Sequence, residues 1–394
     1  METPSEIWDT VERIIASGAK LSIAVTGGGS VAISWLVNHP GASKAFIEAH
    51  VPYQVEALED FLQLSQSLPA NAETARLMAH QSYRRLTKFC SNSDSDSEDR
   101  KSNLVGVGCT AALTTTRKRR GEDRAFISLR KNDAYEIVSL SFSKGASDRI
   151  EQEEVLSREL IALLRRNCDL PMVETLKKAH LYKDVEFTCL PAIVELEALF
   201  RGESEVVAWN PPGLATGIEP VNATQLDRHM LLPGSFNPQH EGHLGLARAA
   251  GELSGRQTSF ELSVANVDKG TLTYSDVVAR LEALSLPIYV TNAPTFLEKA
   301  KKFPGCYFAI GIDTAVRLLD PRYYGENQEA LMAAMAEFDT YSCRFYVAGR
   351  LDDSAFATIR DLNVPQQFEH LFVEIPEELF RLDVSSTSIR ANKL

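Results

Sequence analysis

The sequence predicts an α/β protein built from two units. In residues 227–394, short apolar runs alternate with stretches of helical periodicity, which is the pattern of a mainly parallel sheet with helices on both faces. In residues 21–43, an apolar strand leads through a glycine-rich turn into a helical stretch that stops at a Pro-Gly pair. A chain of 394 residues with 44% hydrophobic residues can build cores for two or three domains.

We expect a first unit at 1–168, a connector at 169–226 and a second unit at 227–394. Residues 91–102 carry no apolar side chain, which predicts a disordered acidic insertion in the first unit. A net charge of −12 argues against general binding to nucleic acid or to an anionic membrane. No run approaches the roughly 20 apolar residues of a membrane span. The scattered cysteines are expected to be reduced, in a protein of the cytoplasm or nucleus.

Short buried strands and helices are expected to alternate through the second unit. Strands are predicted at 260–264, 287–290, 306–310, 344–348 and 371–375, and helices at 275–284, 295–303 and 328–338. Ligands of such sheets bind outside the carboxyl ends of the strands. Lys269 follows the first of these strands, and Gly311 and Asp313 follow the third, so all three are expected at that edge. Lys269 fits a solvated turn as well as a phosphate contact.

The segment Leu-Leu-Pro-Gly-Ser-Phe-Asn-Pro-Gln-His-Glu-Gly-His connects an apolar strand to a helix. Gly234, followed by Ser235 and Phe236, lets the backbone approach a ligand closely. His240 and His243 lie at the start of the helix, where free N–H groups and the helix dipole favour a phosphate. A His pair at this spacing could also bind a metal, but no third ligand stands at a telling spacing, so no metal site is predicted.

The segment Val-Ser-Ser-Thr-Ser-Ile-Arg at residues 384–390 is a second candidate phosphate site. Ser385, Ser386 and Thr387 offer hydroxyl groups and a helix N-cap. Arg390, one turn further on, carries a planar cationic fork that suits phosphate oxygens. An ordinary N-cap would explain this segment alone, but the two segments together indicate binding of a nucleoside triphosphate.

These two segments resemble the nucleotidyltransferase superfamily, and within it the nicotinamide or nicotinate mononucleotide adenylyltransferases, over about residues 227–394. The resemblance implies a Rossmann-like sheet that binds ATP across the strand ends. It also implies adenylyl transfer to a mononucleotide with release of pyrophosphate. His243 would then stabilise the α-phosphate, and His240 and Arg390 would hold the β- and γ-phosphates. Mg²⁺ would arrive with ATP.

The tryptophan positions leave the acceptor open. The adenylyltransferases commonly stack a Trp on the pyridine ring, whereas Trp8, Trp35 and Trp209 all lie outside the second unit. Phe296 or Tyr274 could replace that ring, or the acceptor differs. One alternative is therefore a cytidylyltransferase that acts on a small phosphorylated alcohol, and the other is a non-catalytic nucleotide-sensing or scaffold protein.

Around its glycine-rich turn, the first unit carries the segments Leu-Ser-Ile-Ala, Pro-Gly-Ala-Ser and Val-Pro-Tyr. They resemble the CinA C-terminal family, whose active members deamidate nicotinamide mononucleotide. Tyr53 falls on the family's active-site Tyr, and Thr110 falls on the Thr after its next strand. The resemblance implies a homo-oligomer formed through this unit and a mononucleotide ligand shared by the two units.

The first unit departs from this family at its nucleophile. Thr26 stands in that place in Val-Thr-Gly-Gly-Gly-Ser, and Ser30 is a second hydroxyl in the same turn. The family's later Arg aligns with Gln152 or Glu153. A Thr nucleophile needs an activating base. We therefore expect a degenerate or repurposed deamidase, with an active one as the alternative.

Overall fold

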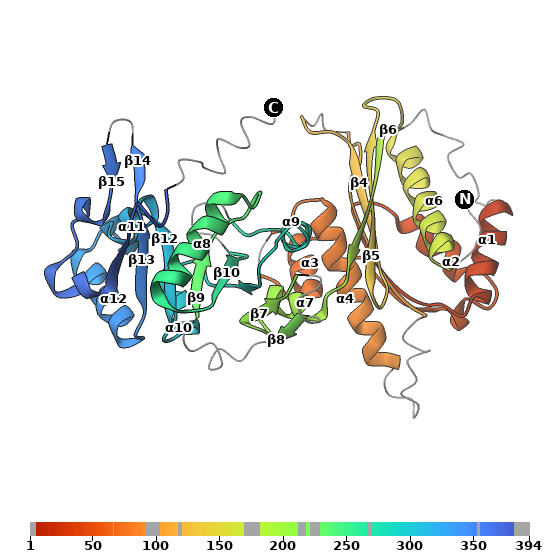
Figure 1. The fold of residues 1–394 in the computed structure, drawn as a ribbon. Coiled ribbons are helices and arrows are strands. Elements are labelled where there is room, and N and C mark those ends of the chain that lie inside the picture. Colours follow the sequence, from red (N-terminus) through yellow and green to blue (C-terminus); the bar gives the residue numbers. More distant parts are fainter. Residues whose placement is uncertain are drawn as a thin grey trace. The chain divides into compact units, whose positions relative to one another are not determined.

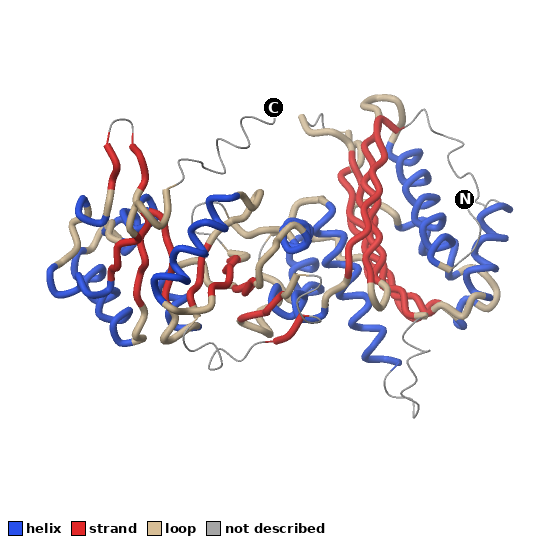
Figure 2. The backbone as a smooth tube through the Cα atoms, in the orientation of Figure 1, coloured by secondary structure: helices blue, strands red, loops and turns tan. Residues whose placement is uncertain are grey.

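A computed structural model divides the chain into two compact units, residues 1–192 and 193–394, and each combines a sheet with helices (Figure 1, Figure 2). The structure describes all residues except 1–4, 66, 91–102, 117–119, 169–181, 212–217, 221–228, 266–269, 353–354 and 382–394. The insertion expected at 91–102 therefore lies outside the described residues. So do five predicted site residues, Lys269, Ser385, Ser386, Thr387 and Arg390.

The first unit is organised around a six-stranded sheet in the order β2-β1-β3-β4-β5-β6. The first three of these strands are parallel, and each later strand runs antiparallel to its neighbour. The strands are β1 (Lys20–Thr26), β2 (Phe46–His50), β3 (Leu104–Ala112), β4 (Arg124–Arg130), β5 (Ala134–Phe142) and β6 (Tyr182–Pro191). Because β1 and β3 are parallel neighbours, the turns that follow them lie at the same edge.

Helices cover both faces of this sheet (Figure 1). One layer contains α1 (Ser5–Ala16), α2 (Ser30–Val37) and α6 (Arg149–Asn167), and the other contains α3 (Val55–Leu62) and α4 (Ala72–Cys90). Side chains alternate along β1, as strand geometry requires. Leu21, Ile23 and Val25 enter the core of the first layer, whereas Ala24 packs with the second. Both faces of β1 are therefore buried.

The second unit contains an eight-stranded sheet in the order β16-β13-β12-β9-β10-β11-β7-β8. Six strands are parallel, and β7 and β8 extend the sheet antiparallel. The strands are β7 (Val206–Trp209), β8 (Ile218–Pro220), β9 (Met230–Pro233), β10 (Thr258–Ser263), β11 (Ile288–Thr291), β12 (Tyr307–Gly311), β13 (Arg344–Ala348) and β16 (Phe372–Ile375). From β9, the chain first adds β10 and β11 on one side of the sheet and later adds β12, β13 and β16 on the other side. The direction of winding therefore reverses between the neighbouring strands β9 and β12. This is the doubly wound order, whose ligands bind at the reversal point.

Helices and short turns connect these strands. The helices are α7 (Val194–Phe200), α8 (Glu241–Ser254), α9 (Tyr274–Glu282), α10 (Phe296–Lys302), α11 (Ile312–Leu318) and α12 (Gln328–Thr340). A two-stranded ribbon joins β14 (Arg350–Asp352) to β15 (Ala355–Ala357). Stacked and edge-on rings of Phe308, Phe338 and Phe345 lie in the core, and all three are fully buried.

The α/β class predicted from the sequence is confirmed. All five strands expected in the second unit are present, as are the three expected helices, with ends shifted by a few residues. The stretch expected as a connector, 169–226, contributes structure to both units where it is described. β6 completes the sheet of the first unit. β7 and β8 extend the sheet of the second unit, and α7 also lies in that unit. The sequence did not reveal these pairings, because β6 pairs with β5 and β7 pairs with β11, and each partner lies far away along the chain.

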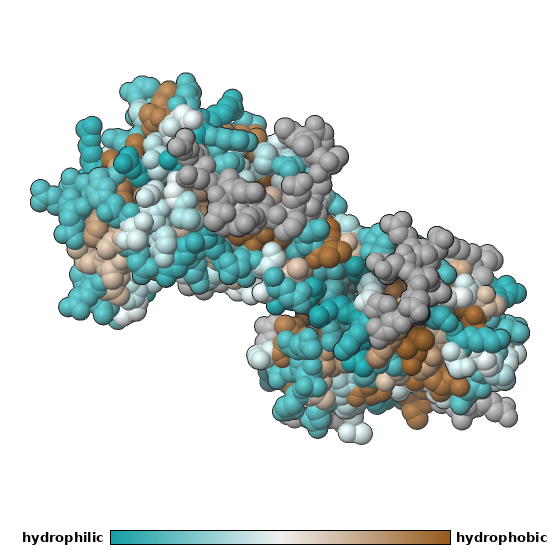
Figure 3. All heavy atoms as spheres, turned by 90° about the horizontal axis from the view of Figure 1, so that it is seen from below, coloured by the Kyte–Doolittle hydropathy of each residue, from teal (hydrophilic) through white to brown (hydrophobic). Residues whose placement is uncertain are grey.

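Among the described helices, none combines the length and apolar character that crossing a membrane requires. On the face drawn in Figure 3, hydrophilic residues cover much of the described surface and hydrophobic patches lie between them.

A buried ion pair joins β10 to α10 in the second unit. The Nζ atom of Lys299 lies 2.7 and 2.8 Å from the two carboxylate oxygens of Glu261 and also donates to the carbonyl of Ala293. The hydroxyl of Thr291 donates to the same carboxylate. Only 6% of the Lys299 side chain and 1% of the Glu261 side chain are exposed. Each charge therefore depends on the other for compensation.

Replacing Lys299 by Met should destabilise the second unit by about 3–5 kcal/mol, because Glu261 would remain buried without its counter-ion. The matched control is Lys301→Met, which breaks the exposed pair with Glu337 and should cost less than about 1 kcal/mol. Urea unfolding of the two variants measures both changes. Equal, small losses in the two variants would contradict the argument.

Candidate functional site

The turn after β9 packs around the buried ring of Phe236. This residue has a φ of 45° and is 1% exposed, and its ring packs against Phe260 and His243. A Cβ atom at Gly234 would lie 2.9 Å from the same ring. The Gly234 N–H donates to the carbonyl of Glu261 and ties the turn to β10. The turn is thus folded against its own aromatic residue, with Ser235 exposed beside it.

His240 and His243 form a stacked pair at the start of α8. Their ring centroids are 3.8 Å apart. The Nδ1 atom of His240 accepts a hydrogen bond from the N–H of Gly242, and Nδ1 of His243 accepts one from the N–H of His240. A neutral imidazole that accepts at Nδ1 carries its hydrogen on Nε2. Each ring therefore has an Nε2–H group as its hydrogen-bond donor.

Burial keeps both rings uncharged. It lowers the pKa of His243 to about 4, with a smaller contribution from the neighbouring His240. Burial also lowers the pKa of His240. At neutral pH, the start of α8 consequently presents two neutral donors together with the positive end of a helix dipole. This arrangement suits an anion that arrives with its own counter-ion.

Of the residues expected at the strand ends, Gly311 and Asp313 follow a strand next to β9, whereas Lys269 lies outside the described residues. β9 and β12 are parallel neighbours, with Met230 opposite Tyr307, so the turn at Gly234 and the residues after β12 follow adjacent strands. A Cβ atom at Gly311 would meet nothing within 4 Å, so space is open there. Asp313 is exposed, and its carboxylate forms a 2.6 Å ion pair with Arg350. A ligand contact by Asp313 would have to compete with Arg350.

Tyr274, one of the two rings considered as a replacement for the missing tryptophan, is not accessible to a ligand. Tyr274 is fully buried, its hydroxyl accepts a hydrogen bond from the N–H of Ile193, and its ring lies against Phe200. It has no free face for a ligand. Phe296 is partly exposed, with its ring edge-on to Phe308. Phe296 is thus the one of the two that retains accessible ring surface.

The glycine-rich turn of the first unit is required by packing. Gly27 and Gly29 have positive φ angles of 75° and 89°. A Cβ atom at Gly27 would lie 2.0 Å from the carbonyl oxygen of Ala111, and one at Gly29 would lie 2.9 Å from the Sγ atom of Cys109. β3 therefore approaches the turn so closely that only glycine fits at these positions.

The residues matched to the deamidase family surround this turn. Thr26 is partly exposed and pairs with buried Thr110 across β1 and β3. Tyr53 is 65% exposed, and Arg149 donates a 3.4 Å hydrogen bond to its hydroxyl. Within the described residues, no carboxylate or imidazole is hydrogen-bonded to the hydroxyl of Thr26. The described part of the chain therefore does not supply the base that a Thr nucleophile requires.

Glu153 is a residue whose role the sequence did not reveal. Its carboxylate accepts hydrogen bonds from the N–H of Gly29, the hydroxyl of Ser30 and the N–H of Val31, at 2.9, 3.0 and 3.1 Å. Gln152 is instead buried and bonds to the N–H of Thr114. Of the two residues aligned with the family's Arg, it is thus Glu153 that faces the turn, and it carries the opposite charge.

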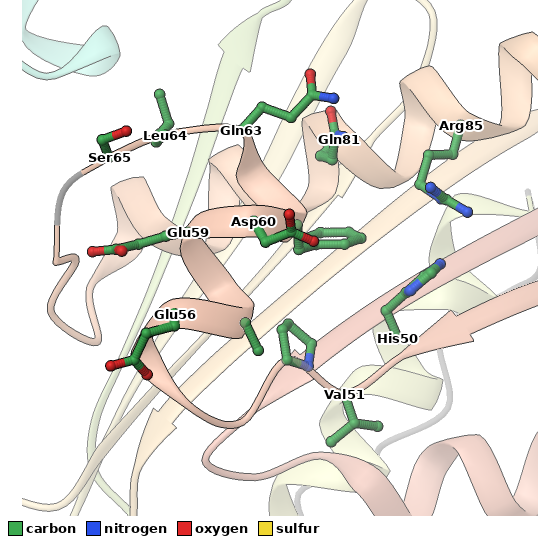
Figure 4. Close-up of a pocket in the computed structure, with 13 residues that line it drawn as sticks. His50, Val51, Glu56, Glu59, Asp60, Gln63, Leu64, Ser65, Gln81 and Arg85 are labelled. Carbon is green, nitrogen blue, oxygen red and sulfur yellow. The ribbon is translucent and has the colours of Figure 1, made fainter.

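A cavity of about 900 Å³ lies at the end of β2, between α3 and α4 (Figure 4). On its wall, Arg85 and His50 both contact the carboxylate of Glu48. Burial alone would raise the pKa of Glu48, but hydrogen bonds from Arg85, His50 and Ser22 outweigh it and lower the pKa to about 2. The other charged residues of the wall are acidic, namely Glu56, Glu59 and Asp60. With Arg85 neutralised, this cavity does not suit a phosphate.

The described residues contain no group of three or more His, Cys, Asp or Glu side chains arranged to hold a metal ion.

Comparisons with known proteins give a structural likeness for part of the chain. No family model and no curated protein matches the sequence. The chain is similar to the competence/damage-inducible protein CihA from Agrobacterium tumefaciens, with 18% identity, 43% of this chain and 96% of that chain covered, and a TM-score of 0.31. It is also similar to CinA-superfamily proteins from Enterobacter cloacae (14% identity, 43% and 95% covered, TM-score 0.33) and Escherichia coli (16%, 43% and 90%, 0.29). Similarity at this level assigns no activity.

The low pKa of His243 predicts a loss of stability in acid. In the unfolded chain the imidazole has its ordinary pKa of 6.5, whereas folding lowers it to about 4. The unfolded state therefore binds the proton more readily, and the free energy of unfolding falls as the pH drops from 6.5 towards 4. Between about pH 7.5 and pH 5, His243→Gln should lose about 1 kcal/mol less stability than the wild type. Urea unfolding at the two pH values measures this, and parallel losses would show that His243 is not the group responsible.

Proposed function

We propose that the second unit transfers an adenylyl group from ATP to nicotinamide or nicotinate mononucleotide and releases pyrophosphate. The observation that carries this proposal is the pair of neutral imidazoles at the start of α8, each with an Nε2–H donor. The pair follows β9, one of the two strands between which the winding reverses. The crevice at such a reversal is where open α/β sheets bind nucleotides.

The proposed reaction needs no covalent enzyme intermediate. A phosphate oxygen of the mononucleotide attacks the α-phosphorus of ATP, and the bond from that phosphorus to the oxygen bridging to the β-phosphate breaks. Pyrophosphate leaves with the bonding electron pair, so catalysis consists of positioning and charge stabilisation. His243 stabilises the charge that builds on the α-phosphate. Neutral His243 does this by donating a hydrogen bond, and its low pKa keeps it in that form.

Further residues complete the proposed ATP site. His240 and Arg390 hold the β- and γ-phosphates, and the hydroxyls of Ser386 and Thr387 bind the triphosphate. Mg²⁺ is carried in by ATP with most of its waters. Open space beside Gly311 is available for the nucleoside.

We propose that the first unit is a degenerate relative of a mononucleotide deamidase. Two observations support this. Thr26 lacks a hydrogen-bonded base among the described residues, and the carboxylate of Glu153 occupies the glycine-rich turn where the family has an Arg. We further propose that this unit is retained for contacts between copies of the chain, which form a homo-oligomer.

His243→Ala should lower the turnover of pyrophosphate release on the order of 10²–10³-fold, as expected for loss of a donor that stabilises transition-state charge. The affinity for ATP should change much less. The control is His370→Ala, which removes an exposed imidazole paired with Asp339. The assay offers ATP or CTP with a panel of phosphorylated acceptors. Activity with CTP and a phosphorylated alcohol would replace the adenylyl assignment, and normal turnover in His243→Ala would remove His243 from the mechanism.

The first unit should release little or no ammonia from nicotinamide mononucleotide. This is expected because a Thr hydroxyl without a base is a slow nucleophile. An ammonia assay that compares the full-length protein with its Thr26→Ala variant tests it. Equal background release in both proteins is the expected result. Robust release that disappears in Thr26→Ala would instead establish the first unit as an active deamidase.

A further inference from the structure

The N-cap residue of α2 provides no side-chain cap for the first N–H groups of the helix. This residue is Gly29, which has no side chain to accept from the free N–H groups of the first helical turn. These groups and the positive end of the helix dipole attract an anion. An anion is present there: the carboxylate of Glu153, which accepts from two backbone N–H groups and from the hydroxyl of Ser30.

Glu153 is held in place by the helix that carries it. α6 begins at a capping box formed by Asp148 and Glu151. Gln152, directly before Glu153, and Leu156, three residues after it, are fully buried. Gln152 also bonds to the N–H of Thr114 and to Asp123. α6 therefore holds the carboxylate of Glu153 at the turn, although the two segments are more than a hundred residues apart in the sequence.

A cation lies at the same turn. Arg149, one helical turn before Glu153, donates hydrogen bonds to the carbonyl of Gly27 and to the hydroxyl of Tyr53. Without Glu153, the turn would combine two unsatisfied N–H groups, the hydroxyl of Ser30 and this guanidinium. Those groups together would form an anion site with a net positive charge.

We propose that Glu153 is a built-in anion that closes the glycine-rich turn of the first unit to phosphate. The carboxylate occupies the donors that a phosphate group would use, and its negative charge repels a second anion. This inference deepens the proposed loss of deamidase activity and rests on it, because a turn closed to phosphate would also reject a mononucleotide.

The test is binding of inorganic phosphate to the full-length protein, read from the amide chemical shifts of Gly29 and Val31. Glu153→Ala should bind phosphate at least about tenfold more tightly at this turn than the wild type does. The control is Glu154→Ala on the same helix, which breaks a pair with Arg158 and should behave like the wild type. These amides report on the first unit alone, so the result does not depend on adenylyl transfer or on ammonia release.

Two outcomes would overturn the proposal. Saturable shifts of the two amides in the wild type would show that the turn is already open to phosphate. Unchanged amides in Glu153→Ala would show that Glu153 is only a structural cap. Should Glu153→Ala fail to fold, Glu153→Ser, whose side chain is too short to reach the turn, is judged by the same amide shifts and the same criteria.

Discussion

Both candidate sites lie at the start of a helix that follows a parallel strand. The first N–H groups of such a helix have no hydrogen-bond partner within the helix and need one from elsewhere. In the second unit, one of these groups is satisfied by the ring of His240, which is itself part of the helix start. In the first unit, two backbone N–H groups are satisfied by Glu153 from a different helix. The same backbone requirement is therefore met by a neutral acceptor in one unit and by a full negative charge in the other. A neutral ring leaves the helix dipole available to a ligand, whereas a carboxylate cancels it.

Neutral histidines are consistent with the proposed binding of a triphosphate together with its Mg²⁺. A charged imidazolium would bind the ground-state phosphates tightly, and binding that is equally strong in the ground state and the transition state does not raise turnover. Burial prevents this by lowering the pKa of His243 to about 4. The cost appears as the sensitivity to acid expected for the second unit, since the buried ring resists protonation only while the chain is folded.

The sequence predicted local elements better than long-range contacts. The strands and helices of the second unit were predictable because each shows its own apolar periodicity, and the His240 turn was predictable because its residues are contiguous. The contacts of Glu153 with the first turn of α2 were not, because they span 122 to 124 residues. The role expected for Tyr274 failed for a related reason. Tyr274 is buried and accepts a hydrogen bond from the N–H of Ile193, 81 residues away, and no local pattern indicates this contact.

The glycine-rich turn also shows why such a motif is weak evidence for a ligand. Gly27 is required because the carbonyl of Ala111 leaves no room for a Cβ atom, and Gly29 is required by its φ angle and by the Sγ atom of Cys109. These constraints come from the packing of β3 and hold with or without a ligand. A turn that lost its ligand would therefore keep its glycines, and the change would appear in the charged residue that faces it. Of the charged residues at this turn, Arg149 and Glu153, it is Glu153 that accepts from the free donors, so the character of the site is set by a side chain outside the motif.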